Sequence, residues 1–196
     1  MELGPAISYF KSQFPSLKQE DIEDVLKISR FVQLDAGEDL IRAGEHKLEI
    51  WFVIKGLVRA YYIKENGQEM TPFFWADNEI TASWESIYLH QPSTLNFEAV
   101  ESTTLAAIDF VEFRKLVNNN SSIQKAYMEM MEQILTATLV QSQSFRNEKP
   151  EDRYLHLIRE NPALLPRLSQ KLMASFLGIT PISFSRMKRR MGVREG

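Results

Sequence analysis

The side chains best suited to do chemistry lie on one face of a short helix expected near the end of the chain. At about 100° per residue, Ile182, Arg186 and Arg189 share one side of this helix, whereas Phe184 and Met187 fall on the other. Arginine forms paired hydrogen bonds with guanine in the major groove of DNA, and it also binds phosphates. An apolar face that packs and a cationic face that stays exposed therefore favour contact with DNA. An ordinary helical hairpin with a charged solvent face is the alternative.

A second helix is expected directly before this one, so that the two form a helix-turn-helix. Ser169 suits the N-cap of the first helix, and Gly178 suits the turn that ends it. Thr180 suits the N-cap of the second helix, and Pro181 suits the next position, where a missing N–H costs little. The expected DNA contacts are the polar and exposed positions of this motif, namely Lys171, Thr180, Ile182, Ser183, Ser185, Arg186, Arg189 and Arg190.

The distribution of charge supports a polyanionic partner for the C-terminal part of the chain. Residues 151–196 hold 9 Lys and Arg against 4 Asp and Glu, a net charge of +5. Residues 1–150 hold 14 against 22, a net charge of −8, so the total of −3 conceals the difference. Such a division indicates a basic module that meets nucleic acid and an acidic module that does not.

The sequence offers no catalytic or metal-binding pattern. The 196 residues include no cysteine, which excludes disulfides, thiolate metal sites and cysteine nucleophiles. His46, His90 and His156 are far apart and have no second ligand at a recognisable spacing, which disfavours the alternative of a cupin-like metal enzyme. We predict no enzymatic activity, no metal and no cofactor. Neither a signal peptide nor an apolar run long enough to span a membrane is present, so we expect a cytoplasmic protein.

A β-rich region is expected at 31–108, after two helices over 5–14 and 16–29 that act as a lid. Apolar and polar residues alternate in this region, and four of the eight glycines of the chain fall at turn positions within 37–67. Asn66-Gly67 is the strongest single signal for a hairpin. Short strands with a turn about every 8 to 12 residues predict a sandwich, a barrel or a jelly roll.

A long helix is expected from the Asn- and Ser-rich cluster at 118–121 to about Ser144. Its apolar residues recur at alternating steps of four and three, as in the seam between two helices, so we prefer a dimer helix over a helix in a monomeric core. The expected interface consists of Ile123, Tyr127, Met130, Met131, Ile134, Ala137, Thr138 and Gln141. The charged run at 146–152 contains a proline and is typical of a hinge.

Together these segments resemble the Crp-Fnr family of bacterial transcription regulators. The resemblance is carried by the runs GEDLIRAGE and IKGLVRAYYIKENGQE, and by RYLHLIRENPALLPRLSQKLMASFLGITPISFSRMKRRM from Arg153, which looks like the subgroup common in Bacteroidetes. It implies an α+β chain: a double-stranded β-helix or jelly roll of the cyclic nucleotide-binding type at 1–117, a dimerisation helix and hinge at 118–147, and a helix-turn-helix domain at 148–196. It also implies a homodimer that binds an inverted repeat in double-stranded DNA, with RNA polymerase as a further candidate partner.

The resemblance implies an effector pocket inside the jelly roll, where this sequence departs from the nucleotide-binding pattern. Asn78-Glu79 stands where Gly-Glu is usual, and Thr94 stands about where an arginine pairs with the cyclic phosphate. The 49 residues from Glu65 to Phe113 contain nine acidic residues and neither lysine nor arginine. A phosphate needs cations or closely approaching amides, so we predict weak or absent cyclic AMP binding and leave the effector unnamed. The candidate pocket residues, for which core packing is the alternative, are Trp75, Glu79, Trp84, Tyr88, Thr94 and Phe97.

The expected recognition helix also departs from the family pattern. Family members commonly read bases with an Arg-Glu-x-x-x-Arg arrangement, and Pro181, Ile182 and Arg186 stand at those positions here. Arg186 keeps its role as a partner of guanine, whereas Ile182 suits a thymine methyl group and not a cytosine amine. Because the sequence ends at Gly196, we expect no β-hairpin wing. The rival hypothesis is a sensor or interaction module that kept the fold but lost DNA binding.

Overall fold

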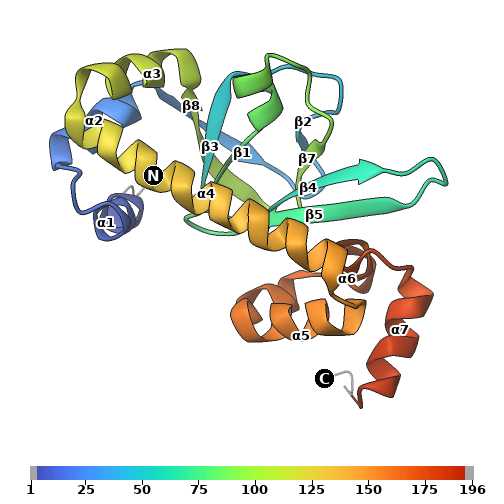
Figure 1. Cartoon of the computed structure of the whole chain (residues 1–196). Coiled ribbons are helices and arrows are strands. Elements are labelled where there is room, and N and C mark those ends of the chain that lie inside the picture. The colour runs from blue at the N-terminus through green and yellow to red at the C-terminus, as the bar shows by residue number, and fades with distance from the viewer. Residues whose placement is uncertain (1–3, 193–196) are drawn as a thin grey trace. The chain divides into compact units, whose positions relative to one another are not determined.

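The computed structural model describes residues 4–192, in which two α-helices are followed by eight strands and then by five further α-helices (Figure 1). The strands are β1 (Ser29–Leu34), β2 (Asp39–Ile41), β3 (Glu49–Lys55), β4 (Val58–Ile63), β5 (Glu69–Trp75), β6 (Ile80–Ala82), β7 (Asn96–Ala99) and β8 (Thr103–Asp109). The α-helices are α1 (Gly4–Gln13), α2 (Gln19–Lys27), α3 (Phe110–Asn119), α4 (Ser121–Asn147), α5 (Pro150–Glu160), α6 (Gln170–Leu177) and α7 (Pro181–Arg190). A π-helical turn spans Glu85–Leu89 and a 3-10 helix spans Pro162–Arg167. None of the described helices is long and apolar enough to cross a membrane.

Two four-stranded sheets form the β-rich region, with strand orders β1-β8-β3-β6 and β2-β7-β4-β5. Strand β8 pairs antiparallel with both β1 and β3 and so lies in the middle of its sheet. Successive side chains of a strand point to opposite faces. Trp51 and Phe52 of β3 are both buried, so this central strand is covered on both of its faces. The predicted α+β chain with a jelly-roll domain is confirmed.

Glycines occupy the strand turns that the sequence predicts. Gly56 links β3 to β4 with a φ of +116°, and a Cβ atom at this position would lie 2.4 Å from Thr103 Oγ1. Only glycine fits this turn, because it combines a positive φ with a close approach to another chain segment. The hairpin predicted at Asn66-Gly67 joins β4 to β5, and its turn is closed by a 2.8 Å hydrogen bond from Gly67 N to Lys64 O.

The chain packs as two compact units that are interleaved in sequence. Unit 1 comprises the residues up to Arg59 together with Phe74–Thr136. Unit 2 comprises Ala60–Phe73, which is the outer part of the β4–β5 hairpin, together with the chain from Ala137 onwards. The expected boundary at 147 coincides with the end of α4 and the one at 117 lies within α3, whereas the packing assigns the two halves of α4 to different units.

The second N-terminal helix begins later than predicted. The sequence predicts it over 16–29, whereas α2 spans Gln19–Lys27. The carboxylate of Asp21 accepts a 2.8 Å hydrogen bond from Lys18 N and a 2.6 Å bond from Asn120 Nδ2. A buried carboxylate needs such donors. Asp21 therefore attaches α2 to the residue that precedes α4.

One side of the first half of α4 is buried within unit 1, which corrects the predicted dimer seam at two positions. Ile123 and Met130 belong to apolar clusters that also contain Phe113 and Phe14 from the same unit. Their side chains are buried by their own chain and are not available to a partner. A helix that packs on its own domain has the same periodicity as one that packs on a partner helix, so the spacing does not distinguish the two contacts.

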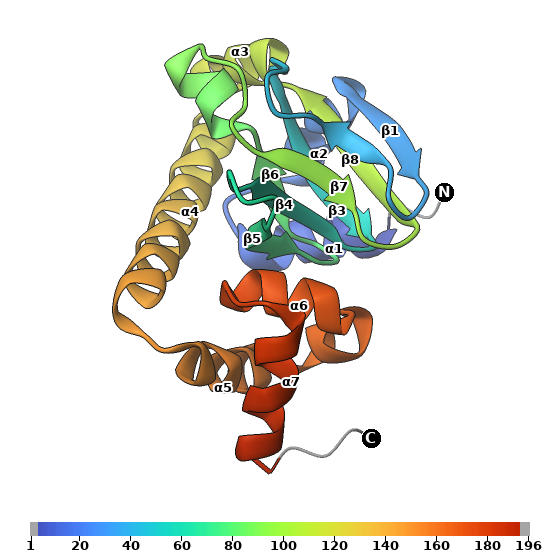
Figure 2. The same ribbon diagram turned by 90° about the vertical axis from the view of Figure 1, so that its right-hand side faces the viewer.

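The helices of unit 2 meet at a buried guanidinium. Figure 2 shows α5, α6 and α7 grouped together. Arg153 of α5 is 9% exposed; its Nη1 donates to Glu148 O at 2.7 Å, and its Nη2 donates to Leu177 O, the last carbonyl of α6. The guanidinium also lies 5.0 Å from the centre of the Phe145 ring in α4. Burial lowers the pKa of Arg153, but an arginine side chain remains charged in proteins.

Replacement of this arginine tests its role. Arg153→Met should lower the free energy of unfolding by about 2 to 4 kcal/mol, because the carbonyls of Glu148 and Leu177 lose their charged donor. Arg159→Met on the same helix is the matched control and should cost less than about 1 kcal/mol, because the Arg159–Glu160 ion pair is exposed. Urea unfolding followed by circular dichroism measures both values. Equal losses for the two variants would contradict the prediction.

Candidate nucleic-acid interface

The turn between α6 and α7 has the geometry that the sequence predicts. Ser169 Oγ accepts a 3.2 Å hydrogen bond from Leu172 N and caps α6, which Gly178 ends with a φ of +75°. Thr180 Oγ1 accepts a 3.2 Å bond from Ser183 N and caps α7. The same hydroxyl lies 3.0 Å from Ser183 Oγ, so both of these expected DNA contacts take part in the cap. The expectation about a wing concerns residues after 192, which lie outside the described part of the chain.

One face of α7 anchors the helix within unit 2. Phe184 and Met187 are each 2% exposed. The Phe184 ring meets the Tyr154 ring of α5 edge to face, with 5.4 Å between the ring centres. Lys188 Nζ lies 5.5 Å from the centre of the Phe184 ring. These contacts fix which side of α7 faces outwards, in agreement with the predicted division of its faces.

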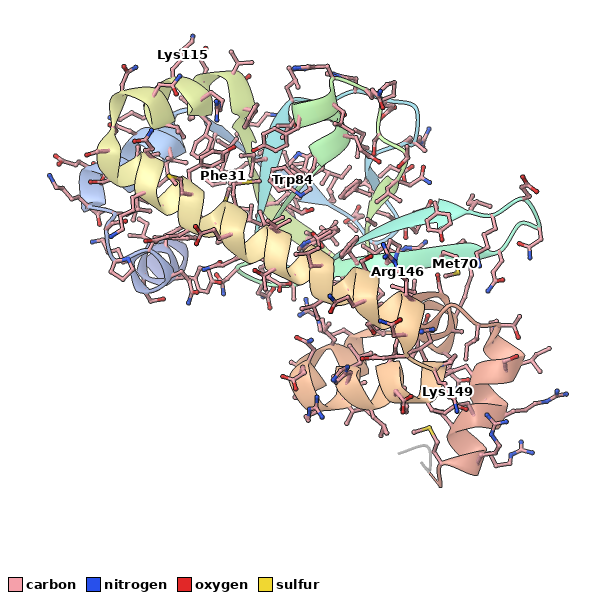
Figure 3. All side chains as sticks on the ribbon, viewed as in Figure 1. Phe31, Met70, Trp84, Lys115, Arg146 and Lys149 are labelled. Atoms are coloured by element: carbon pink, nitrogen blue, oxygen red, sulfur yellow. The ribbon has the colours of Figure 1, made fainter. Side chains whose placement is uncertain are left out.

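The opposite face of α7 carries the predicted reading residues. Ile182 is 67% exposed, and Ser185, Arg186 and Arg189 are exposed as well. Within residues 4–192, neither Arg186 nor Arg189 forms an ion pair. Figure 3 shows nitrogen-tipped side chains that project outwards from α7. This face therefore offers an apolar group and two cations to a ligand.

Two other expected DNA contacts are engaged with carboxylates. Lys171 Nζ lies 2.9 Å from Glu69 Oε1 of the hairpin, and Arg190 Nη2 lies 2.6 Å from Glu151 Oε1 of α5. Both cations are largely exposed, and an exposed ion pair is worth little in water. Lys171 and Arg190 can therefore exchange a carboxylate for a phosphate, but each carries a competing negative neighbour.

The outer part of the β4–β5 hairpin packs on α6, a contact that the sequence did not predict. Ser175 Oγ lies 2.9 Å from Thr71 Oγ1 and donates a 3.0 Å hydrogen bond to Glu69 O. A Cβ atom at Gly178 would lie 3.1 Å from Met70 Cε of the hairpin, so the turn and the hairpin are in van der Waals contact. In the sequence, this contact is indicated only by Ser175, a polar residue on the packing side of a helix. Its position does not identify a partner about a hundred residues away.

The aromatic residues expected in the effector pocket serve two packing clusters. Trp75 and Phe97 stack with 5.6 Å between their ring centres, and Phe97 also meets Trp51 at 5.4 Å. Trp84 and Tyr88 stack on each other at 6.0 Å, outside that first cluster. Trp51 and Phe97 of the first cluster are both buried, which favours core packing over a ligand site at these residues.

The polar groups of the expected pocket do not form a phosphate site. Thr94 donates from its backbone N at 3.1 Å and from its hydroxyl to the carboxylate of Glu85, so an anion already occupies these donors. Glu79 is exposed, and its carboxylate accepts from a backbone amide. Arg59 is a buried cation, but it pairs with Glu98 at 3.2 Å. Among the described residues, no group of three or more potential metal ligands occurs.

Comparison with known proteins identifies the domain and the architecture. Residues 31–120 match the family model of the cyclic nucleotide-binding domain, whereas no curated protein sequence matches the chain. The c-di-GMP responsive regulator CLP of Xanthomonas campestris is similar in structure, with a TM-score of 0.74 and 16% identity over 91% of this chain and 96% of that one. A Crp/Fnr family transcriptional regulator from Eubacterium rectale has a TM-score of 0.68 and 16% identity, over 93% of this chain and 88% of that one. The Thermus thermophilus catabolite activator protein has a TM-score of 0.58 and 20% identity, over 94% of this chain and 90% of that one.

A jelly roll, a long helix and a helix-turn-helix follow one another along this chain. The chain carries a cyclic nucleotide-binding domain and has the fold of the Crp-Fnr transcription regulators. Identities of 16% to 20% show a shared fold and do not transfer the roles of individual residues to this chain.

Cyclic AMP should fail to bind despite the domain type. The carboxylate of Glu85 occupies the donors of Thr94, and the segment from Glu65 to Phe113 contains neither lysine nor arginine to hold a phosphate. Isothermal titration calorimetry at neutral pH should therefore give no saturable heat. A regulator known to bind the nucleotide is the positive control under identical conditions. Saturable binding in the micromolar range would overturn the prediction.

Proposed function

We propose that the protein is a DNA-binding transcription regulator of the Crp-Fnr type that reads DNA with the exposed face of α7. The observation that carries the proposal is the division of α7: Phe184 and Met187 hold one face inside unit 2, and this leaves Ile182, Arg186 and Arg189 exposed on the other. A recognition helix needs this combination, because its orientation must be fixed while its reading side chains reach the groove.

Each exposed residue has a separate chemical role in the proposal. Arg186 donates two hydrogen bonds to the O6 and N7 atoms of a guanine, and Ile182 contacts the methyl group of a thymine. Arg189 lies one turn further along the helix and binds phosphate, which sets orientation and not sequence. The operator therefore differs from a palindrome that is read by a glutamate at the position of Ile182.

The proposal includes a homodimer whose α4 helices pair through an exposed apolar stripe. Met128, Leu135 and Leu139 are 58%, 59% and 54% exposed, and they lie within about 20° of one line along α4. A row of exposed apolar residues at this spacing suits a two-helix seam. Among the remaining residues of the predicted seam, Ala137 and Thr138 are exposed and Tyr127, Met131, Ile134 and Gln141 are half-buried. A dimer places two recognition helices on successive half-sites of an inverted repeat, about 34 Å apart.

The remaining partners follow from this role. A regulator that binds DNA acts in the cytoplasm of a bacterium, and RNA polymerase is a candidate partner once the protein is bound upstream of a gene.

The rival is a sensor or interaction module without DNA binding, and the engagement of Lys171 with Glu69 and of Arg190 with Glu151 favours it. Binding of mixed genomic DNA over a range of salt concentrations separates the two, because only the regulator loses affinity steeply with salt.

Two arginine variants distinguish base reading from phosphate binding. On a site selected from genomic fragments, Arg186→Ala should lose about 1 to 3 kcal/mol of binding free energy while its affinity for random DNA changes little. Arg189→Ala should weaken binding to both DNAs and lower the slope of log K against log salt by about one. Fluorescence anisotropy at four salt concentrations measures these quantities.

The exposed Arg159 of α5 provides a matched control for these variants. Arg159→Ala should bind both DNAs as the wild type does, because this residue lies outside the proposed contact face. Equal losses on selected and random DNA for Arg186→Ala would remove its role in base reading. Salt-independent binding by the wild type would remove the proposed function.

A charge in the apolar stripe should break the dimer. Leu135→Arg should raise the dissociation constant of the dimer by about a hundredfold or more, because it places two like charges across a desolvated seam. Leu155→Arg on α5 replaces a residue of similar exposure, 51% against 59%, and should leave the dimer intact. Sedimentation velocity over a dilution series measures both. A Leu135→Arg protein with the dimer affinity of the wild type would show that the stripe is not the interface.

A further inference from the structure

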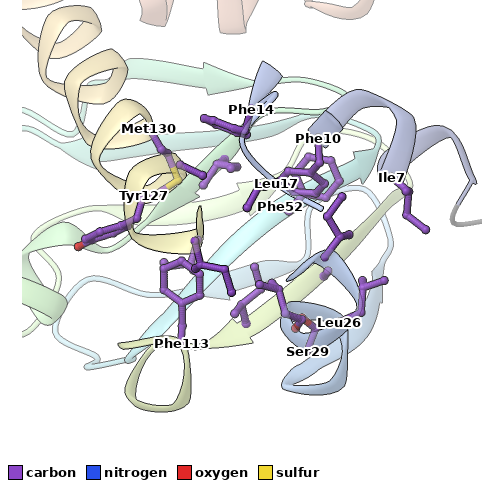
Figure 4. Close-up of a pocket in the computed structure, with 18 of the residues that line it drawn as sticks. Ile7, Phe10, Phe14, Leu17, Leu26, Ser29, Phe52, Phe113, Tyr127 and Met130 are labelled. Carbon is purple, nitrogen blue, oxygen red and sulfur yellow. The ribbon is translucent and has the colours of Figure 1, made fainter. Parts of the chain in front are cut away.

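Unit 1 contains an apolar cavity between the N-terminal helices and the outer face of the first sheet. Its volume is about 80 Å³. Its lining includes Phe10 of α1 and Phe14 just after it, Phe52 of β3, and Ala126 and Met130 of α4. Figure 4 shows Phe10, Phe14, Phe52 and Met130 around it. We call this cavity, defined by these residues, the lid pocket. All of its lining residues belong to unit 1.

The lid pocket is distinct from the interior of the jelly roll, because the two lie on opposite faces of β3. Trp51 points into the roll, where its ring meets Phe97 at 5.4 Å. Its neighbour Phe52 points the other way and meets Phe10 of α1, with 4.4 Å between the ring centres. A ligand in the lid pocket therefore does not compete for the place where a nucleotide would bind in the roll.

The chemistry of the lining excludes a polar ligand. The two hydroxyl groups of the lining belong to Ser29 and Tyr127, and both are engaged. Ser29 Oγ donates to Val25 O at 2.7 Å, and the Tyr127 hydroxyl bonds to that of Tyr88. A polar or charged group placed here would lose its hydration without gaining a partner. An uncharged apolar molecule has no hydrogen bonds with water to lose on entering the pocket.

The size of the pocket limits the ligand further. Protein interiors are close-packed, and an unfilled apolar void lowers stability in proportion to its volume. An engineered apolar cavity of about 150 Å³ stays dry and binds benzene. The lid pocket has about half of that volume. As it stands, it suits a short alkyl chain, and it accepts a single ring when the flexible thioether of Met130 moves aside.

We propose that the lid pocket binds a small uncharged apolar molecule, such as a single aromatic ring, and that this molecule is the class of effector to which the protein responds. Occupancy packs α1, β3 and α4 against a common ligand. Ala126 and Met130 lie on the same helix as Met128 of the exposed stripe, so a ligand that moves them also moves that stripe. Binding in the pocket stands independently of the proposed function, whereas the effector role rests on it.

The test uses the full-length protein and toluene as the probe. Toluene at about ten times its dissociation constant should raise the melting temperature by roughly 3 °C, since it binds the folded state alone. It should also shift the NMR signals of the Met130 and Ala126 methyl groups with saturation. Ala126→Leu fills the pocket and should abolish both effects. Ala163→Leu, which adds the same atoms at an exposed position away from the pocket and from the proposed seam, should respond as the wild type does.

A second variant that fills the lid pocket keeps the test valid if Ala126→Leu does not fold. Ala106→Val adds methyl groups from β8, on the sheet side of the pocket, and should also abolish toluene binding. Absence of a saturable shift in the wild type, or binding that survives in both filled variants, would overturn the proposal.

DNA affinity measured with and without toluene separates binding in the lid pocket from the effector role. A protein that binds toluene but not DNA keeps the pocket and loses the proposed function, whereas unchanged DNA affinity on saturation removes only the effector role.

Discussion

The helix-turn-helix depends on one buried cation that satisfies two helix ends. The last carbonyls of a helix have no partner within it, and they carry the negative end of the helix dipole. Arg153 donates to Leu177 O at the end of α6 and to Glu148 O just after α4, and it covers the Phe145 ring with its planar group. A lysine has a single nitrogen and no planar fork, so it offers less to this arrangement. The orientation of α7 follows, because Gly178 begins the turn directly after the carbonyl that Arg153 holds.

Helix α4 has one face that is buried in its own unit and another that is exposed. The face with Ile123 and Met130 completes the core of unit 1 and borders the lid pocket, while the face with Met128 and Leu135 stays exposed. These faces are about 140° apart, which is enough for one helix to pack on its own domain and to present a second face to a partner. The proposed ligand in the lid pocket would therefore act on the same helix that carries the proposed dimer seam.

The hairpin contributes to the nucleic-acid side of the molecule through polar contacts. Thr71 and Glu69 bind Ser175 of α6, and Glu69 also engages Lys171. A hydroxyl pair buried from water holds α6 firmly, whereas an exposed ion pair contributes little and can be exchanged. The acidic hairpin thus holds α6 in place while it engages one of the cations that the proposed DNA contact would use. This arrangement links the charge imbalance of the sequence to a physical contact.

The local features can be predicted from the residues alone, because short-range physics fixes them: the caps at Ser169 and Thr180, the turn at Gly178, the two faces of α7 and the hairpin at Asn66-Gly67. The fold class is predictable too, through the change of period between the strands and the helices. Which surface covers each apolar face depends instead on long-range packing. Ile123 has the spacing of a dimer seam and packs inside its own unit, because periodicity states that a side is buried and not by what. The pairing of Ser175 with Thr71 and the void beside Ala126 were likewise decided by tertiary packing, since each depends on segments that are distant in sequence.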